Sequence, residues 1–239
     1  MSVRIGLLSA TIMVCLASAG AAWAQPGLAN KVEEPYVTKG LTEVEVRGGR
    51  LTGGPDGGDN AEIIEVEHGF TDHVSFTGVA NFDDGELESL GVETIVNFGK
   101  LAGLDIGFYA DYMQPVHNGP GEIETKFLFA RRNADSEVLF NLILQKSMTS
   151  HPGEGDTEVG YAAQATKALG SEDFQAGIQA FGDVGTGHHS AEIYVGPVAR
   201  LELDESGIDL EAAYLFALGE ARNDARGQWR IALGWERKF

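Results

Sequence analysis

The last eleven residues of the chain, 229–239, alternate between apolar and polar side chains and end on an aromatic residue. One face of this segment carries Trp229, Ile231, Leu233, Trp235 and Phe239, and the other carries Arg230, Ala232, Gly234, Glu236 and Lys238. Such a period of two indicates a β-strand, because successive side chains of a strand point to opposite faces of a sheet. The chain is therefore predicted to end on a strand with one apolar and one mixed face.

Similar alternating segments recur along the chain, separated by clusters of Gly, Asp, Asn, Pro and Ser. We predict twelve strands, at residues 41–52, 61–70, 74–82, 88–98, 104–114, 122–132, 137–147, 157–167, 174–184, 190–203, 208–219 and 228–239. No helical pattern follows the first 24 residues. Pro197 falls inside one of these segments and cannot donate to a sheet ladder, so we expect a bulge or a local break there.

Alternation alone does not decide whether the apolar faces point inward, as in a soluble barrel or sandwich, or outward toward lipid. Four features favour lipid. Segments of about ten residues suit tilted strands that cross a bilayer, and their number is even. Connections alternate between short turns and longer glycine-rich loops, as at the two ends of a membrane barrel. Trp229 and Phe239 would differ in height by about 25 Å, the spacing of two aromatic girdles. The predicted fold is all-β, an antiparallel up-and-down transmembrane β-barrel of about 12 strands.

The closing strand, which ends on Phe239, resembles the last strand and assembly signal of bacterial outer-membrane β-barrels. It departs from that signal at Arg237, where an apolar or aromatic residue is usual. The resemblance implies that Trp229, Trp235 and Phe239 form the girdle and the assembly signal. It also implies a location in the cell outer membrane, with outer-membrane lipid, lipopolysaccharide and the barrel-insertion machinery as partners.

The layout of the whole chain resembles the small outer-membrane barrels of proteobacteria. The residues that carry this resemblance are Pro35-Tyr36-Val37 ahead of Gly40, the turn His68-Gly69-Phe70-Thr71-Asp72, Tyr194-Val195-Gly196-Pro197 and the final strand. A weaker resemblance is to transporter-like barrels encoded beside aromatic-degradation pathways, which implies passage of small apolar compounds. These motifs are structural, so no binding site follows from them.

The first 24 residues have the layout of a secretory signal peptide, with Arg4, an apolar run and Ala22-Trp23-Ala24 before Gln25. We predict a signal peptide at residues 1–24, a short periplasmic lead-in at 25–40 and a single barrel domain at 41–239. The one cysteine, Cys15, lies within the signal, so the mature chain is expected to hold no disulfide and no thiolate metal site.

Acidic residues outnumber basic ones on the mixed faces of the predicted strands. The predicted lumen-facing acids are Glu43, Glu45, Glu65, Glu67, Asp105, Asp111, Glu122, Glu124 and Glu211. In a water-filled lumen their field would admit cations and repel anions. They are also consistent with a narrow, closed barrel in which carboxylates pair with the few bases. We therefore predict a passive pore for small cationic or neutral solutes, or a closed structural barrel.

Other functional classes have weaker support. With 36 Asp and Glu against 17 Lys and Arg, the chain is not expected to bind nucleic acid. His117, His151, His188 and His189 fall in predicted outer loops and offer a metal-binding module. Ser190 with His188 would be the only pair suited to a lipid-modifying barrel enzyme. We predict no catalytic residue, no cofactor and no metal site, and keep a secreted or periplasmic β-sandwich as an alternative.

Overall fold

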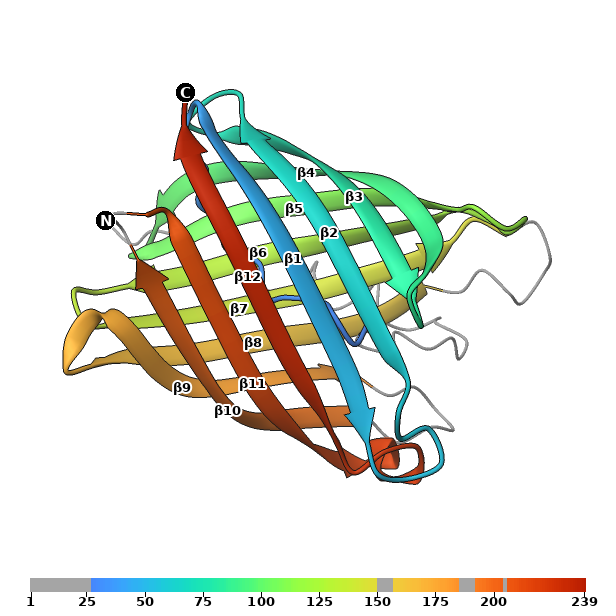
Figure 1. Ribbon diagram of the computed structural model, residues 1–239. Helices are drawn as coiled ribbons and strands as arrows, with labels where there is room; N and C mark the ends of the chain where they lie inside the picture. Colours follow the sequence, from blue (N-terminus) through green and yellow to red (C-terminus); the bar gives the residue numbers. More distant parts are fainter. Residues whose placement is uncertain (1–26, 150–156, 185–191, 204–205) are drawn as a thin grey trace, which may run out of the picture.

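The computed structural model describes residues 27–149, 157–184, 192–203 and 206–239. The chain forms a closed barrel in which every strand pairs antiparallel with its sequence neighbours and the last strand pairs with the first (Figure 1). The strands are β1 (Leu41–Thr52), β2 (Asn60–Gly69), β3 (Val74–Asp83), β4 (Glu86–Leu101), β5 (Leu104–Pro115), β6 (Glu122–Arg132), β7 (Ser136–Ser147), β8 (Thr157–Leu169), β9 (Ser171–Asp183), β10 (Glu192–Leu203), β11 (Ile208–Gly219) and β12 (Gly227–Lys238). A short 3-10 helix, η1 (Glu220–Asn223), precedes β12. Within these described ranges, no helix has the length and apolar character needed to cross a membrane. The predicted fold class and number of strands are confirmed.

Pro197 lies within β10 without changing the strand count. The register of β10 against β11 is the same on both sides of it, since Val195 pairs with Phe216 and Val198 with Ala213. On its other side Pro197 pairs with Ile178 of β9. The expected break is therefore limited to the pairing with β11, and no bulge forms.

The two ends of the barrel differ in their connections. The end that holds the carboxy terminus, here called the tight-turn end, has short links such as Ala102-Gly103 and Gly170, which adopt positive φ angles. The opposite end, the loop end, carries longer connections at 53–59, 116–121 and 220–226. One loop-end link departs from the predicted alternation: Asp84-Gly85, with φ of 48° and 78°, closes a two-residue hairpin. Positive φ at both central residues suits the right-handed twist of the flanking strands.

Apolar side chains cover the outside of the barrel, whereas polar and charged ones are buried inside it. On β1, for example, Val46 is 45% exposed, while its neighbours Glu45 and Arg47 are 8% and 6% exposed. Large exposed apolar side chains occur on all twelve strands, far more than the surface of a water-soluble monomer carries. A soluble barrel or sandwich would bury these faces against each other. The secreted β-sandwich is therefore excluded, and the outer surface suits contact with lipid.

Residues 27–40, here called the lumen segment, run through the inside of the barrel, where Figure 1 shows them in blue among the strands. The sequence predicts a periplasmic lead-in at 25–40, and the described residues of that stretch, 27–40, lie inside the barrel. Its backbone lies against inward-facing glycines of the wall: a Cβ on Gly49 would be 2.0 Å from the Leu28 oxygen, and one on Gly69 would be 2.1 Å from the Thr38 oxygen. The segment packs against wall positions that have no side chain, so its backbone lies close to the backbone of the strands.

Candidate functional site: the barrel lumen

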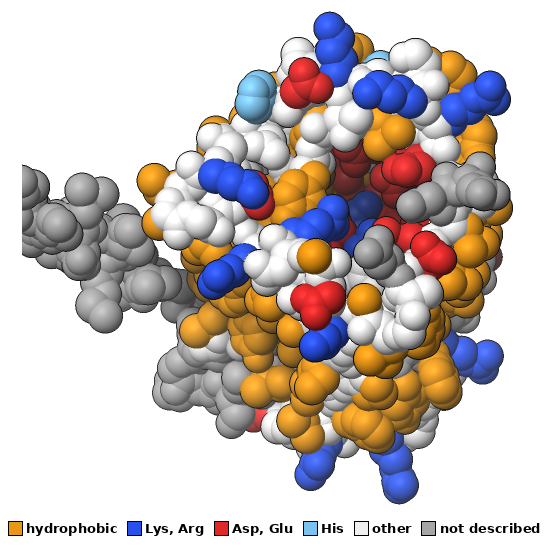
Figure 2. Space-filling model, turned by 90° about the vertical axis from the view of Figure 1, so that its left-hand side faces the viewer, with side chains coloured by type: hydrophobic (Ala, Val, Ile, Leu, Met, Phe, Trp, Pro, Cys, Tyr) orange, Lys and Arg blue, Asp and Glu red, His pale blue; other side chains and the backbone are white. Residues whose placement is uncertain are grey.

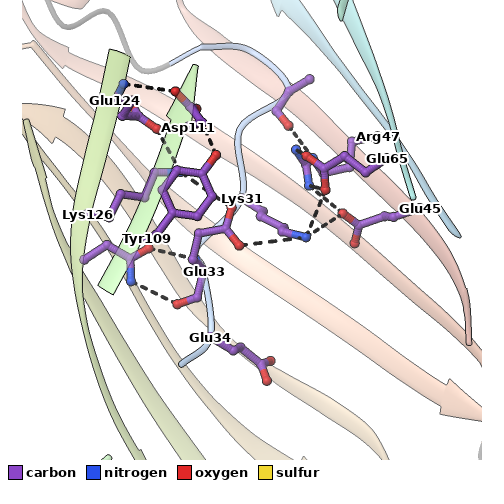
Figure 3. A network of polar contacts seen from close by, with 12 residues as sticks. Lys31, Glu33, Glu34, Glu45, Arg47, Glu65, Tyr109, Asp111, Glu124 and Lys126 are labelled. Carbon is purple, nitrogen blue, oxygen red and sulfur yellow. Dashed lines mark hydrogen bonds and ion pairs between the residues drawn. The ribbon is translucent and has the colours of Figure 1, made fainter. Parts of the chain in front are cut away.

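Lys31 of the lumen segment reaches two carboxylates on the wall (Figure 3). Its Nζ lies 3.1 Å from Glu45 Oε1 and 3.1 Å from Glu65 Oε2, and 3.8 Å from Glu33 Oε2. Arg47 Nη1 donates to the same two carboxylates, at 2.5 Å and 2.8 Å, while its Nε donates to the Ala29 carbonyl oxygen at 2.8 Å. Burial acts to lower the pKa of Lys31, but the three carboxylates outweigh it and hold that pKa well above its usual range. Lys31 is therefore an ammonium cation.

Glu33 is fixed to the opposite wall by its backbone and by its side chain. The Asn141 amide pairs with the backbone of Glu33: Glu33 N donates to Oδ1 at 2.7 Å, and Nδ2 donates to the Glu33 oxygen at 2.9 Å. The Glu33 carboxylate lies 3.5 Å from Lys126 Nζ, which also contacts Glu124 at 3.0 Å and stands 4.2 Å over the centre of the Tyr109 ring. The Asn141 side chain thus makes two hydrogen bonds with the Glu33 backbone of the kind that a neighbouring strand would make.

Glu34 points to a third part of the wall and bridges two arginines. Its carboxylate lies 2.8 Å from Arg200 Nη1 on β10 and 3.1 Å from Arg132 Nη2 on β6. Burial acts to raise the pKa of Glu34, but Arg200 and Arg132 outweigh it, so the pKa lies below its usual value. Arg132 also pairs with Glu137 at 2.6 Å and stacks 4.5 Å over the Tyr36 ring. Residues 31–36 are therefore anchored by charge to opposite sides of the barrel.

In the part of the barrel that the structure describes, one cavity lies on each side of the lumen segment. The larger, of about 330 Å³, opens at the tight-turn end, where Figure 2 shows a hollow with acidic and basic side chains. The smaller, of about 100 Å³, lies toward the loop end, between Asn81, Met113 and Gln145. Lys31 and Glu33 line both cavities, so these two residues form the partition between them.

The larger cavity, here called the mouth, carries a strong excess of negative charge. Its lining holds nine carboxylates against three basic residues: Glu33, Glu34, Glu43, Glu45, Glu67, Glu202, Asp209, Glu211 and Glu236 against Lys31, Arg132 and Arg200. Glu43, Glu67 and Asp209 make no ion pair with any residue that the structure describes. The mouth therefore presents a negative field to the space at the tight-turn end.

The inner face of β7–β11 is apolar over much of its length. Leu139, Ile143, Ala162, Phe181, Tyr194, Val198, Ala213, Leu215 and Ala217 form one buried cluster there, and Val32 of the lumen segment packs into it. Side chains fill this part of the interior, which leaves the open space near the charged strands.

All nine of the acidic residues predicted to face the lumen point to the inside of the barrel. Glu43, Glu45, Glu67 and Glu211 line the mouth, and Asp111, Glu122 and Glu124 line the smaller cavity. Glu65 is held by Lys31 and Arg47, and Asp105 accepts a hydrogen bond from Tyr36 at 3.4 Å. Their role in cation passage stays a prediction.

The sequence pattern did not identify the residues of the lumen segment as part of the site. Lys31, Glu33 and Glu34 lie in a stretch without strand periodicity, and their partners are 14 to 166 residues away in the chain. One signal was available: Gly49, Gly69 and Gly107 occur at inward positions of predicted strands. Glycine in a strand marks a close approach of another backbone, and Pro35 of the segment lies against Gly107.

The predicted girdle residues Trp229, Trp235 and Phe239 all lie on the outer face, at 57%, 41% and 77% exposure. Trp229 packs against Tyr214 of β11, with ring centroids 4.7 Å apart, close to the loop end. Phe239 lies at the other end of β12, where its backbone N donates to the Gly40 oxygen at 2.8 Å. Their role as an assembly signal stays a prediction.

Deletion of Phe239 tests that role. We expect less folded barrel in the membrane with normal synthesis and export, because the insertion machinery would no longer find the terminal aromatic. The measurement is the heat-dependent mobility of the protein on SDS gels of isolated membranes. Phe239→Tyr, which keeps a terminal aromatic ring, serves as the control. Wild-type amounts of folded protein from the truncated gene would contradict the prediction.

Of the remaining candidate groups, the structure describes only His117. His151, His188, His189 and Ser190 are outside the described residues, and His117 is exposed in the loop at 116–121. In the part of the chain that the structure describes, no group of three or more His, Cys, Asp or Glu side chains is arranged to hold a metal ion.

Comparison with protein-family models and with the sequences of curated proteins finds no match. Solved structures do resemble this barrel. An outer membrane channel from Pseudomonas putida F1 superposes with a TM-score of 0.63 at 11% identity, over 88% of this chain and 99% of that one. The KdgM porin in complex with disordered oligogalacturonate gives 0.58 at 10% identity, over 82% and 99%. The NanC porin gives 0.57 at 12% identity, over 82% and 99%. At these identities the likeness concerns the fold, and this chain has the porin-like β-barrel fold of bacterial outer-membrane channels.

Proposed function

We propose that this protein is a channel of the bacterial outer membrane that passes small cationic solutes. The apolar outer face, with Trp229 and Phe239 at opposite ends of β12, supports a membrane location. The inward-facing charged groups and the cavities on both sides of the lumen segment support a path for solutes through the barrel.

The observation that carries the cation preference is the excess of carboxylates at the mouth. Glu43, Glu67 and Asp209 line the mouth without an ion-pair partner among the described residues. Rings of carboxylates in a confined space of low dielectric constant raise the local concentration of cations and lower that of anions. The lumen segment, which stands between the two cavities, restricts passage to small solutes.

The position of the lumen segment favours a second candidate, a closed structural barrel. Lys31 and Glu33 stand between the two cavities, and both are ion-paired to the wall. In a closed structural barrel, the same charged side chains serve only to hold the segment in place and to fill the interior.

Reversal potentials of the pure protein in planar bilayers under a KCl gradient separate the two candidates. We expect a current with a preference for potassium over chloride. The triple variant Glu43→Gln, Glu67→Gln, Asp209→Asn should shift the reversal potential toward the non-selective value, because it removes the carboxyl groups of the mouth that have no ion-pair partner among the described residues. The control variant Asp83→Asn, Glu86→Gln, Glu88→Gln removes the same formal charge from exposed positions at the loop end and should change it much less. No current, or a chloride preference, would contradict the proposal.

A further inference from the structure

Glu45 and Glu65 face each other directly across neighbouring strands. They are paired residues in the register of β1 against β2, and their side chains are on the inner face. Like charges directly opposite one another destabilise a sheet unless cations lie between them. Arg47 supplies one positive charge, through Nη1 to both carboxylates and a second contact from Nη2 to Glu65. The pair therefore keeps one uncompensated negative charge for a further cation.

In this structure that further cation is the ammonium group of Lys31. Lys31 comes from a segment that is not part of the sheet, and its Nζ is 3.1 Å from an oxygen of each carboxylate. These are ordinary distances for N–H donation to oxygen, and a primary ammonium has three N–H groups to direct at such acceptors. The Lys31 side chain is 24% exposed and lines both cavities, so a solute in either cavity has access to this position.

We propose that Glu45 and Glu65 form a binding site for a primary ammonium group, which Lys31 occupies as a tethered internal ligand. A small solute with a primary ammonium group competes with Lys31 for the same two carboxylates. This binding site exists whether or not the barrel conducts; only the further step, in which the competing solute passes between the cavities, rests on the proposed channel function. The substrate class that follows is small primary amines.

Chemical rescue of the variant Lys31→Ala tests the site. Alanine lacks the three methylene groups and the ammonium of lysine, which together make a propylammonium ion. We expect propylammonium to raise the thermal unfolding temperature of Lys31→Ala in detergent, with a saturable dependence on concentration. Tetramethylammonium, which has the charge but no N–H group, should not do so at the same ionic strength.

Two variants and the wild type serve as matched controls. Lys31→Met fills the space of the lysine side chain without its charge, so propylammonium should find no room. Lys39→Ala removes a lysine from the same segment at an exposed position. Neither variant, nor the wild type, should show the saturable increase. An equal response in all four proteins, or no response in folded Lys31→Ala, would overturn the proposal.

If Lys31→Ala does not fold by itself, its refolding yield from urea replaces the unfolding temperature. Recovery with propylammonium but not with tetramethylammonium supports the site, and no recovery with either overturns it. Both readouts measure binding without any current. Rescue in a protein that carries no current would therefore support the ammonium site and overturn the channel. A cation-selective current without rescue would support the channel and overturn the ammonium site.

Discussion

Deletion of residues 27–37 is expected to raise the single-channel conductance severalfold. These residues include Lys31 and Glu33, which separate the mouth from the smaller cavity, so their removal joins the two spaces. The twelve strand pairings involve no residue of this stretch, so the barrel itself should still form. Conductance in planar bilayers and heat-dependent mobility on SDS gels measure the two effects separately.

Glycine substitutions provide an independent route to the same result with the chain length unchanged. A valine at Gly49 or Gly107 would meet the lumen segment, because even a Cβ there would be 2.0 Å from the Leu28 oxygen or 2.8 Å from the Pro35 Cβ. The control is Gly78→Val on β3, where a Cβ has nothing within 4 Å. We expect a smaller increase in conductance than from the deletion, and none from the control. Unchanged conductance in a folded deletion variant would show that the lumen segment is not the obstruction.

Arginine in place of Leu233 is expected to destabilise the barrel by about 2–4 kcal/mol, the cost of a basic side chain near the bilayer midplane on the lipid face. Leu233 is 49% exposed on the outer face of β12, about midway between Trp229 and Phe239. Its neighbour Ala232 points inward and lines the mouth. Arginine there lies among carboxylates such as Glu211 and Glu236, so Ala232→Arg should cost much less.

The free energy of unfolding in phospholipid vesicles, measured by denaturant titration, compares the two variants. They introduce the same side chain at adjacent positions of one strand, so the new residue and the change in net charge are matched. Equal destabilisation by both substitutions would contradict the assignment of the outer face to lipid. A larger loss for Ala232→Arg would contradict it more strongly.

Much of the strand framework was predictable from the sequence because strand periodicity is a local property. The predicted bounds 41–52, 122–132 and 208–219 coincide with β1, β6 and β11, and the other strands differ by a few residues at their ends. The largest differences are at β4 and β9, which extend further toward their turns than the apolar pattern does. The geometry of a turn depends on the pairing of its two strands and leaves only a weak signal in the sequence. The turn between β8 and β9, with the single positive-φ residue Gly170, is an example.

By itself, the sequence determined that the chain is a series of antiparallel strands, each with one apolar and one mixed face, because that alternation is written into consecutive residues. Only the tertiary structure decided that the mixed faces enclose a lumen and that residues 27–40 occupy it. The contacts that hold this segment, such as Lys31 with Glu65 and Glu34 with Arg200, join residues 34 and 166 positions apart. Such pairs come together only when β1 closes against β12, since barrel closure brings all inner faces around one axis.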